Sequence, residues 1–284
     1  MVRRIFPDGR TFEQVRNHYL VEKAIARRLK QSSREERKAF YPLIYTELFS
    51  KVPDHPRLRE KQSEKEALKK CGQKFQLVAE HLDQTAVLVE FGPGDCRFSY
   101  FVSPRVSRVI AVDIADQKLP GIPTPANFQL VLYDGFSLPL EDGIADVVFS
   151  DQFIEHLHPE DAEDHFRLVK RILKDKGVYA FRTPHAYFGP HDVSRYFSEK
   201  PEGFHLKEWT YSELMKMLKK LEFSSWSGFW RVNKKINKKY IGMPSFYFHF
   251  VERMLPVFPY RVRKVISRLF LPKQIYMTAI GQLP

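Results

Sequence analysis

Residues 87–113 read VLVEFGPGDCRFSYFVSPRVSRVIAVD and contain a glycine loop between two apolar runs. Gly92 and Gly94 stand one residue apart, Glu90 precedes them, and Cys96 occupies the place where a third glycine could be expected. Glycine allows a backbone to turn sharply and to approach a ligand closely. The stretch therefore predicts a strand that ends in a ligand-binding turn.

The residues after position 85 predict an open α/β sheet. Short apolar runs alternate with helical stretches, as in a doubly wound, mostly parallel sheet that is covered on both faces. The clearest crossover helix is PEDAEDHFRLVKRILKDKG, with Pro159 near its first turn and Gly177 just beyond its end. The seven predicted strands are 87–91, 108–112, 128–132, 145–150, 177–182, 223–232 and 274–280.

The first part of the chain predicts helices. Apolar residues recur at three- and four-residue steps between lysines and arginines. Ser33 has the residue type of an N-cap for a second helix, and a third is expected over 63–82. We therefore divide the chain into a helical N-terminal region, 1–84, and an α/β domain, 85–284.

Composition restricts the setting of the protein. The 284 residues, 43% of them hydrophobic, can bury one sizeable core. Two cysteines exclude a disulfide framework and indicate a reducing compartment. Neither a signal-peptide pattern nor a membrane-spanning run is found, so we expect a cytoplasmic protein. Any contact with a membrane would be peripheral. The net charge of +12 favours an acidic partner.

Residues 233–273 form a basic insert between the last two predicted strands. Two apolar helical faces are expected, made of Tyr247, Val251, Met254 and Leu255 and of Val262, Val265, Ile266, Leu269 and Phe270. Basic amphipathic helices can lie on an anionic membrane. They can equally pack over a pocket with their charged side in water. Both interpretations stay open.

The glycine loop resembles the first motif of class I S-adenosylmethionine-dependent methyltransferases, roughly E-x-G-x-G-x-G. Glu90, Gly92 and Gly94 match this motif, and Cys96 departs at its last and most variable glycine. A dinucleotide-binding G-x-G-x-x-G would place Arg97 at the third glycine, which weakens that alternative. The resemblance implies a Rossmann-like methyltransferase fold, S-adenosylmethionine as the cofactor and S-adenosylhomocysteine as the product.

The resemblance continues through the next strands, over about residues 85–184. Asp113 ends the second strand, where an acid can accept hydrogen bonds from both ribose hydroxyls. The family places an acid beside the adenine amino group at the position of Asp134. Each such residue alone could also cap a helix or make a turn. The cofactor-binding residues that the resemblance implies are Glu90, which would also orient the loop, Gly92, Gly94, Asp113, Asp134, Gly135 and Asp151.

The expected catalytic residues are histidines. His156 follows the fourth strand beside Glu155, and His191 lies in the long connection after the fifth strand. We predict that His156 or His191 is the general base or orients the acceptor, and that Asp192 raises the pKa of His191 if their side chains meet. Alternatively, Glu155 and His156 cap the following segment and line the adenosine pocket.

A metal-dependent reaction is the weaker hypothesis. The same segment resembles methyltransferases in which E-x-x-E-H and a later histidine hold a divalent metal near a substrate hydroxyl. Gln152 replaces the first glutamate here and removes a charged ligand that a hard cation prefers. We therefore predict no metal.

The sequence predicts methyl transfer to an oxygen or nitrogen of a small-molecule, lipid-linked or glycan acceptor. The protein would align the two reactants and, for a hydroxyl, remove a proton. A nucleic-acid methyltransferase would explain the charge, but the N/D-P-P-Y/F motif of base amino-methylating enzymes is missing after the fourth strand. A non-catalytic cofactor-binding partner protein is the third alternative, and the polar residues after Thr183 argue against it.

Overall fold

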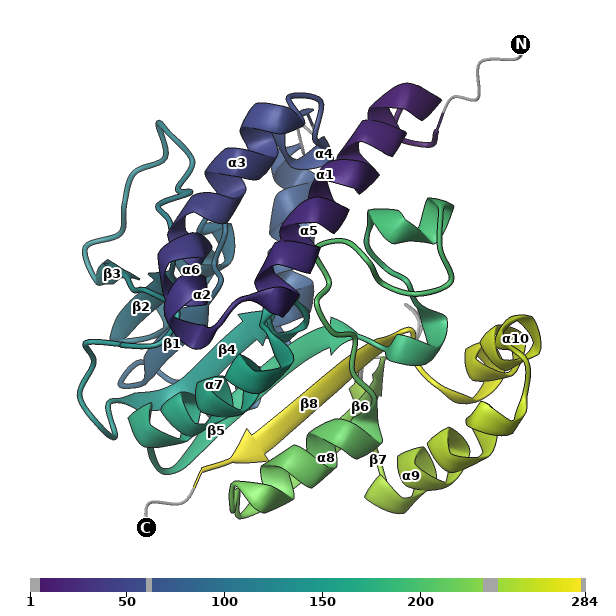
Figure 1. The fold of residues 1–284 in the computed structure, drawn as a ribbon. Helices are drawn as coiled ribbons and strands as arrows, with labels where there is room; N and C mark the ends of the chain where they lie inside the picture. The colour runs from purple at the N-terminus through teal and green to yellow at the C-terminus, as the bar shows by residue number, and fades with distance from the viewer. Residues whose placement is uncertain (1–5, 60–62, 232–239, 282–284) are drawn as a thin grey trace.

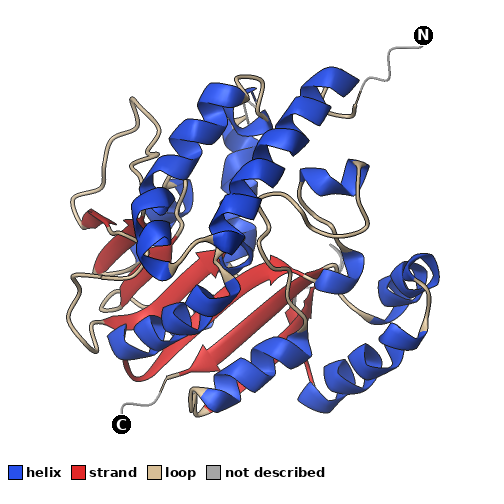
Figure 2. Ribbon diagram, in the orientation of Figure 1, coloured by secondary structure: helices blue, strands red, loops and turns tan. Residues whose placement is uncertain are grey.

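The computed structural model describes residues 6–59, 63–231 and 240–281. An eight-stranded sheet crosses the molecule, and helices lie on both of its faces (Figure 1, Figure 2). The strands are β1 (Val87–Phe91), β2 (Arg108–Asp113), β3 (Phe128–Leu132), β4 (Ala145–Asp151), β5 (Leu173–Pro184), β6 (Ser225–Arg231), β7 (Tyr240–Met243) and β8 (Gln274–Ile280).

The strand order is β3-β2-β1-β4-β5-β8-β6-β7. The first five strands pair in parallel, β8 runs antiparallel to β5 and β6, and β7 runs antiparallel to β6. β2 and β3 are added on one side of β1, whereas β4 and the later strands are added on the other side. The loops after β1 and β4 therefore lead in opposite directions. Ligands bind at such a switch point. The predicted doubly wound, mostly parallel α/β sheet is confirmed.

The sheet has one strand more than the seven predicted. β7 pairs with the outer side of β6 over Gly228 to Arg231. It is short and falls inside the region that the sequence predicted as a helical insert. Residue 232 of the predicted strand 223–232 and residues 233–239 of the predicted insert lie outside the described residues.

The central strands are buried on both faces. Alternate side chains of β1, β2 and β4 enter two separate apolar clusters, as the period of two in a strand requires. Val89, Ile110 and Val148 belong to one cluster, and Leu88, Val109 and Val147 to the other.

Helices surround this sheet, including the expected crossover helix α7. The longer ones are α1 (Phe12–Gln31), α2 (Arg34–Phe40), α3 (Ile44–Lys51), α5 (Glu64–Phe75), α6 (Arg97–Val102), α7 (Pro159–Ile172), α8 (Tyr211–Lys220), α9 (Ser245–Met254) and α10 (Tyr260–Phe270). A short helix, α4, spans Pro56–Arg59. Within the described ranges, no helix combines the length and the apolar character that crossing a membrane requires.

The N-terminal region is helical, as predicted, but its helices are shorter. The predicted second helix divides into α2, the 3-10 turn η1 (Tyr41–Leu43) and α3, because Pro42 cannot donate a helical hydrogen bond. The predicted third helix ends at Phe75. Ser33 and Ser63 accept hydrogen bonds from Glu36 N and Glu66 N, which confirms both helix starts.

Candidate cofactor-binding and active site

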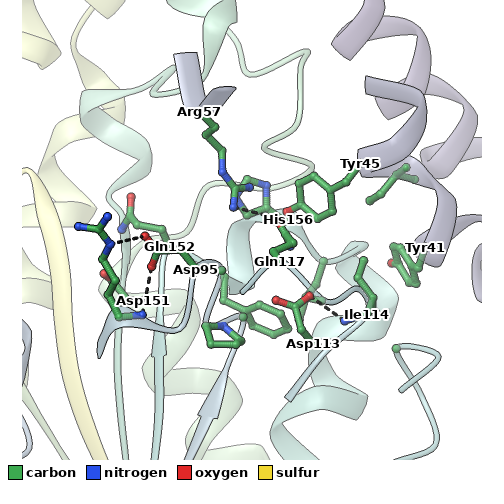
Figure 3. Close-up of a pocket in the computed structure, with 18 of the residues that line it drawn as sticks. Tyr41, Tyr45, Arg57, Asp95, Asp113, Ile114, Gln117, Asp151, Gln152 and His156 are labelled. Atoms are coloured by element: carbon green, nitrogen blue, oxygen red, sulfur yellow. Dashed lines mark hydrogen bonds and ion pairs between the residues drawn. The ribbon is translucent and has the colours of Figure 1, made fainter. Parts of the chain in front are cut away.

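A cavity of about 640 Å³ lies at the carboxyl ends of β1, β2 and β4. Figure 3 shows Asp113 and Asp151 low in this cavity, with Arg57 and Tyr45 of the N-terminal region above them. The N-terminal region therefore forms one wall of the cavity. Its lining residues are Tyr41, Ile44, Tyr45, Phe49, Arg57, Leu58 and Lys74.

The glycine loop forms the floor of the cavity. Gly92 has φ +63°, and a Cβ atom there would lie 2.6 Å from Cδ2 of Phe153. Gly94 has φ +56°, and a Cβ atom there would lie 3.4 Å from a guanidinium nitrogen of Arg57. Both glycines line the cavity. The loop therefore needs glycine at Gly92 for conformation and for space.

Cys96 also has a left-handed backbone, with φ +61°, at the position where the family motif has its last glycine. Its side chain is buried, and burial raises the pKa of the thiol to about 12. A thiol with this pKa stays protonated at neutral pH and is a poor nucleophile. Cys96 is a small packing residue.

Asp113 ends β2 and is 6% exposed at the cavity. Its Oδ1 accepts hydrogen bonds from Ile114 N, at 2.7 Å, and Ala115 N, at 3.4 Å. Burial raises the pKa of this carboxyl to about 6. The loop and the end of β2 thus bring Gly92, Gly94 and Asp113 into one cavity, as the resemblance implied.

Glu90 does not line the cavity. It lies inside β1 at 1% exposure, and its Oε2 accepts a hydrogen bond of 2.5 Å from the Ser99 hydroxyl on α6. Burial raises its pKa to about 7. The prediction that Glu90 binds the cofactor therefore has no support in this geometry, whereas the predicted role in orienting the loop fits the bond to α6.

Asp134 is not among the residues that line the cavity. Its Oδ1 accepts hydrogen bonds from Phe136 N and Ser137 N, and its Oδ2 pairs with Lys38 at 3.0 Å. These bonds close the turn after β3, so the carboxylate lies outside the cavity. Gly135 does line the cavity, where a Cβ atom would lie 2.9 Å from the Tyr41 ring.

Asp151 lines the cavity, but two cations hold its carboxylate. Lys74 Nζ lies 2.9 Å from Oδ2, and the Arg182 guanidinium binds both oxygens. Although burial alone would raise the pKa of Asp151, the charges of Lys74 and Arg182 lower it. Asp151 is therefore an ionised acid at the wall of the cavity.

His156 is the predicted catalytic histidine that reaches the cavity. Its Nδ1 lies 2.9 Å from the carbonyl oxygen of Phe204 and must donate the hydrogen bond. The neutral ring consequently carries its lone pair on Nε2. Burial, together with the charge of His205, lowers the pKa of His156 to about 3. The imidazole is therefore neutral at physiological pH.

His191 lies outside the cavity. Its Nε2 is 3.2 Å from the His185 carbonyl oxygen, and burial lowers its pKa to about 4. The condition under which Asp192 would raise this pKa is not met, because the Asp192 carboxylate accepts backbone N–H bonds from Ser194, Gly203 and His205 instead. The position and environment of His191 therefore do not suit a catalytic base.

The later histidine that the sequence left unidentified lies beside Glu155 and His156. Ligand atoms of Glu155, His156 and His205 all lie within 4.8 Å of one another, so these three residues could hold a cation. His205, not His191, is the later histidine of the group. Its Nδ1 bonds to Glu208 at 2.8 Å, and Glu155 Oε2 accepts a bond of 2.9 Å from Thr183.

The charges of this cluster already compensate one another in part. Burial alone would lower the pKa of His205, but the hydrogen bond to Glu208 and the charge of Glu155 raise it. Burial raises the pKa of Glu155 to about 7. Among the described residues, Glu155 Oε1 is buried without a hydrogen-bond partner. The hydrogen bond to Glu208 and the charge of Glu155 thus favour the charged form of His205, the form that weakens the attraction of the cluster for a cation.

Comparison with known proteins agrees with this geometry. Residues 89–181, from β1 into β5, match the family model of a methyltransferase domain. A SAM-dependent methyltransferase from Archaeoglobus fulgidus has the same fold, with a TM-score of 0.52, 16% identity and coverage of 75% of this chain and 94% of that chain. Residues 89–181 therefore form a methyltransferase domain, in a chain with the fold of S-adenosylmethionine-dependent methyltransferases.

A second solved methyltransferase shares the fold. Phosphoethanolamine N-methyltransferase 2 of Haemonchus contortus was solved with phosphomonomethylethanolamine and S-adenosylhomocysteine. It has a TM-score of 0.51 and 14% identity, and the match covers 80% of this chain and 60% of that chain. A search of curated proteins found no match to this chain.

Polar residues of the N-terminal region also line the cavity of the methyltransferase domain. The sequence analysis did not single them out. Arg57 donates to Gln117 at 3.0 Å and lies over the Tyr45 ring, 5.3 Å from its centroid. Arg57, Gln117 and Tyr45 all line the cavity. The one sequence signal for these residues is the change from helix to the proline-rich stretch KVPDHPRL, which does not indicate where Arg57 points.

Proposed function

We propose that the cavity binds S-adenosylmethionine and that the enzyme transfers its methyl group to an oxygen or nitrogen of a small-molecule, lipid-linked or glycan acceptor. The observation that carries this proposal is Asp113, which stands beside the Gly92–Gly94 loop in one cavity at the switch point of a methyltransferase sheet. A carboxylate in this position suits the two hydroxyls of a ribose.

The cavity lining suggests how the cofactor lies. Ile114, Leu119 and Gly135 offer an apolar surface for the adenine ring, and Asp113 lies next to Ile114 for the ribose. Arg57 is a cation whose guanidinium approaches the loop at Gly94. We assign Arg57 to the carboxylate of the methionine moiety, because a guanidinium pairs strongly with a carboxylate.

We assign His156 to the acceptor. Its Nε2 lone pair can accept a hydrogen bond from an acceptor O–H or N–H group and orient the attacking atom. That atom forms a bond to the methyl carbon, the carbon–sulfur bond breaks, and its electron pair stays on the sulfur of S-adenosylhomocysteine. The proton of the acceptor leaves to water, because burial lowers the pKa of His156 to about 3 and makes Nε2 a weak base. Alignment of the two reactants supplies most of the rate.

The N-terminal region completes this proposed site. Tyr41, Tyr45 and Arg57 cover the cavity over the glycine loop, so the region 1–84 would limit access of solvent and of large acceptors. A covered cavity favours an acceptor that presents a small group. Cys71 and Cys96 are both unpaired, which is consistent with a reducing compartment such as the cytoplasm.

Calorimetry with S-adenosylmethionine, S-adenosylhomocysteine and NAD tests the cofactor. We expect binding of the first two and none of NAD; tighter binding of NAD would contradict the proposal. The acceptor is tested with labelled S-adenosylmethionine in fractionated lysate, with separate small polar, lipid, glycan, RNA and protein fractions. Label in the RNA fraction alone would contradict the proposed acceptor class and leave cofactor binding intact.

A further inference from the structure

The two helices after β7 form a hairpin on the outer side of the sheet, joined by the 3-10 turn η7 (Leu255–Val257) (Figure 1). Large apolar side chains on the outer face of this hairpin are exposed. Phe246, Phe250 and Met254 follow one another at four-residue steps on α9, and Val262, Val265 and Leu269 form a stripe on α10; their exposed fractions range from 45% to 75%. Val257 in the turn is 72% exposed.

The opposite face of the hairpin already holds it to the core. Phe248 stacks on Tyr211, with 3.7 Å between ring centroids, and Leu255 is buried. Glu252 accepts hydrogen bonds from Tyr211 N and Ser212 N at the start of α8 and pairs with His185 at 2.8 Å. Because the inner face supplies this packing, the outer apolar stripes have no role in attaching the hairpin.

The exposed charged residues of the hairpin are positive. Arg253, Arg261, Arg268 and Lys273 are exposed. The one acidic residue between 240 and 273 is Glu252, which is buried in the bonds to α8. The outer face therefore combines apolar side chains with uncompensated positive charge. Water is a poor environment for so many large apolar side chains, and exposed apolar surface rimmed by charge is typical of an interaction site.

We propose that the α9–α10 hairpin docks on the surface of an anionic lipid bilayer. Apolar side chains would enter the boundary between headgroups and acyl chains, while the arginines and Lys273 would meet lipid phosphates. A second copy of this chain would bring the same positive charge to the contact and be repelled. A nucleic acid would satisfy the charges but leave the phenylalanines in water.

The hairpin also contacts the connection that leads from β5 to α8. The Tyr260 hydroxyl and Lys264 Nζ donate to the carbonyl oxygen of Gly189, at 2.9 and 3.2 Å. The same connection carries His205, beside the proposed acceptor residue His156. A docked hairpin would thus place the acceptor side of the cavity near the bilayer. Membrane binding itself does not depend on the proposed methyl transfer.

Flotation of the full chain with vesicles tests the proposal. Phosphatidylcholine vesicles are compared with vesicles that contain about 30% phosphatidylglycerol, a fraction that gives a strongly negative surface. We expect binding to the anionic vesicles and at least tenfold weaker binding to the neutral ones. Raising the salt from about 50 mM to about 500 mM should weaken the anionic binding, because salt screens surface charges.

Two variants test the contributions of the basic and the apolar side chains separately. The first changes Arg253, Arg261, Arg268 and Lys273 to Gln, and its control changes the exposed Arg16, Arg27, Lys69 and Lys70 to Gln. The second carries Phe250→Ser and Leu269→Ser, and its control carries Leu43→Ser and Leu68→Ser, which are also exposed. We expect each hairpin variant to bind anionic vesicles at least tenfold more weakly than its control, with unchanged thermal melting and cofactor affinity.

Three results would overturn the proposal. The first is wild-type protein that stays unbound with both kinds of vesicle. The second is equal binding by the hairpin variants and their controls, which would assign the interaction to the net charge of the chain. The third is light scattering that gives a dimer for the wild type and a monomer for the Phe250→Ser, Leu269→Ser variant without vesicle binding, since a second copy would then occupy the stripes.

Discussion

Lys74 of α5 and Asp151 at the end of β4 form an ion pair, with 2.9 Å between Nζ and Oδ2. This bond joins the N-terminal region to the wall of the cavity, and Arg182 holds the same carboxylate from the neighbouring strand. Although burial alone would lower it, the pKa of Lys74 is raised by the charge of Asp151. Helices that precede the methyltransferase domain thus line the same cavity as its glycine loop.

Asp113→Asn should bind S-adenosylmethionine more than tenfold more weakly, because the ribose hydroxyls lose a charged acceptor. Wild-type affinity should also fall as the pH drops through about 6, where the carboxylate of the free enzyme becomes protonated. Calorimetry across pH measures both effects. An affinity for the Asn variant equal to that of the wild type would rule out Asp113 as the ribose acceptor.

The same variant should stabilise the protein without cofactor. The folded-state pKa of Asp113, about 6, lies above the ordinary value of 3.8, so ionisation costs folding free energy as pH rises between these values. Urea unfolding should show a gain on the order of 1 to 2 kcal/mol for Asp113→Asn at neutral pH, which disappears below about pH 4. A gain that is independent of pH would contradict this assignment.

Gly92→Ala should lower the free energy of unfolding by about 2 to 4 kcal/mol, because it adds a left-handed alanine and a Cβ that meets Phe153. Gly121→Ala is the matched control. Gly121 has φ +79° but no heavy atom within 4 Å of the added Cβ, so its substitution should cost only about 1 kcal/mol. Equal losses in both variants would show that contact with Phe153 does not restrict the loop.

His156→Ala should retain cofactor affinity and lose roughly a hundredfold or more in kcat, once the acceptor is identified. His191→Ala is its control and should stay within a few-fold of the wild type, because His191 lies outside the cavity. Single-turnover kinetics separate methyl transfer from acceptor binding. Full activity of His156→Ala would eliminate His156 as the acceptor-orienting residue.

Chelator treatment should leave the turnover unchanged, because Glu208 already holds His205 Nδ1 and Thr183 already donates to Glu155 Oε2. Activity is measured after dialysis against EDTA and again with Mg²⁺, Mn²⁺ or Zn²⁺ added. Melting of the wild type and of Glu155→Gln with each ion provides a second readout. Activity that is lost with chelator and restored by one ion would establish a metal at Glu155, His156 and His205.

Arg37→Met should destabilise the fold by about 3 to 5 kcal/mol, because Asp161 would remain buried without its partner. Arg37 is 1% exposed and donates to both Asp161 oxygens from α2. Arg34→Met, on the same helix, removes an exposed pair with Asp164 and should cost less than about 1 kcal/mol. Similar losses in urea unfolding would show that the buried pair does not hold α2 to α7.

The sequence alone predicted the fold of the domain and several of the residues that line the cavity. Apolar runs of strand length and the positions of glycine are local properties, and they predicted the positions of β1 to β5 and placed Gly92, Gly94 and Asp113 at strand ends that meet in one cavity. The match of Asp134 was equally good in sequence, but nearby backbone N–H groups and Lys38 compete for its carboxylate. Sequence position could not resolve that competition.

Only the tertiary structure decided which distant residues meet. Arg57 and Lys74 enter the cavity from helices that precede β1, and His205 rather than His191 joins His156, because a loop turns back to bring residue 204 within 2.9 Å of that ring. Which side chains of the hairpin are exposed likewise depends on which face of α9 packs against Tyr211. Periodicity in the sequence shows that a helix has an apolar face, but the surrounding fold determines whether that face is covered.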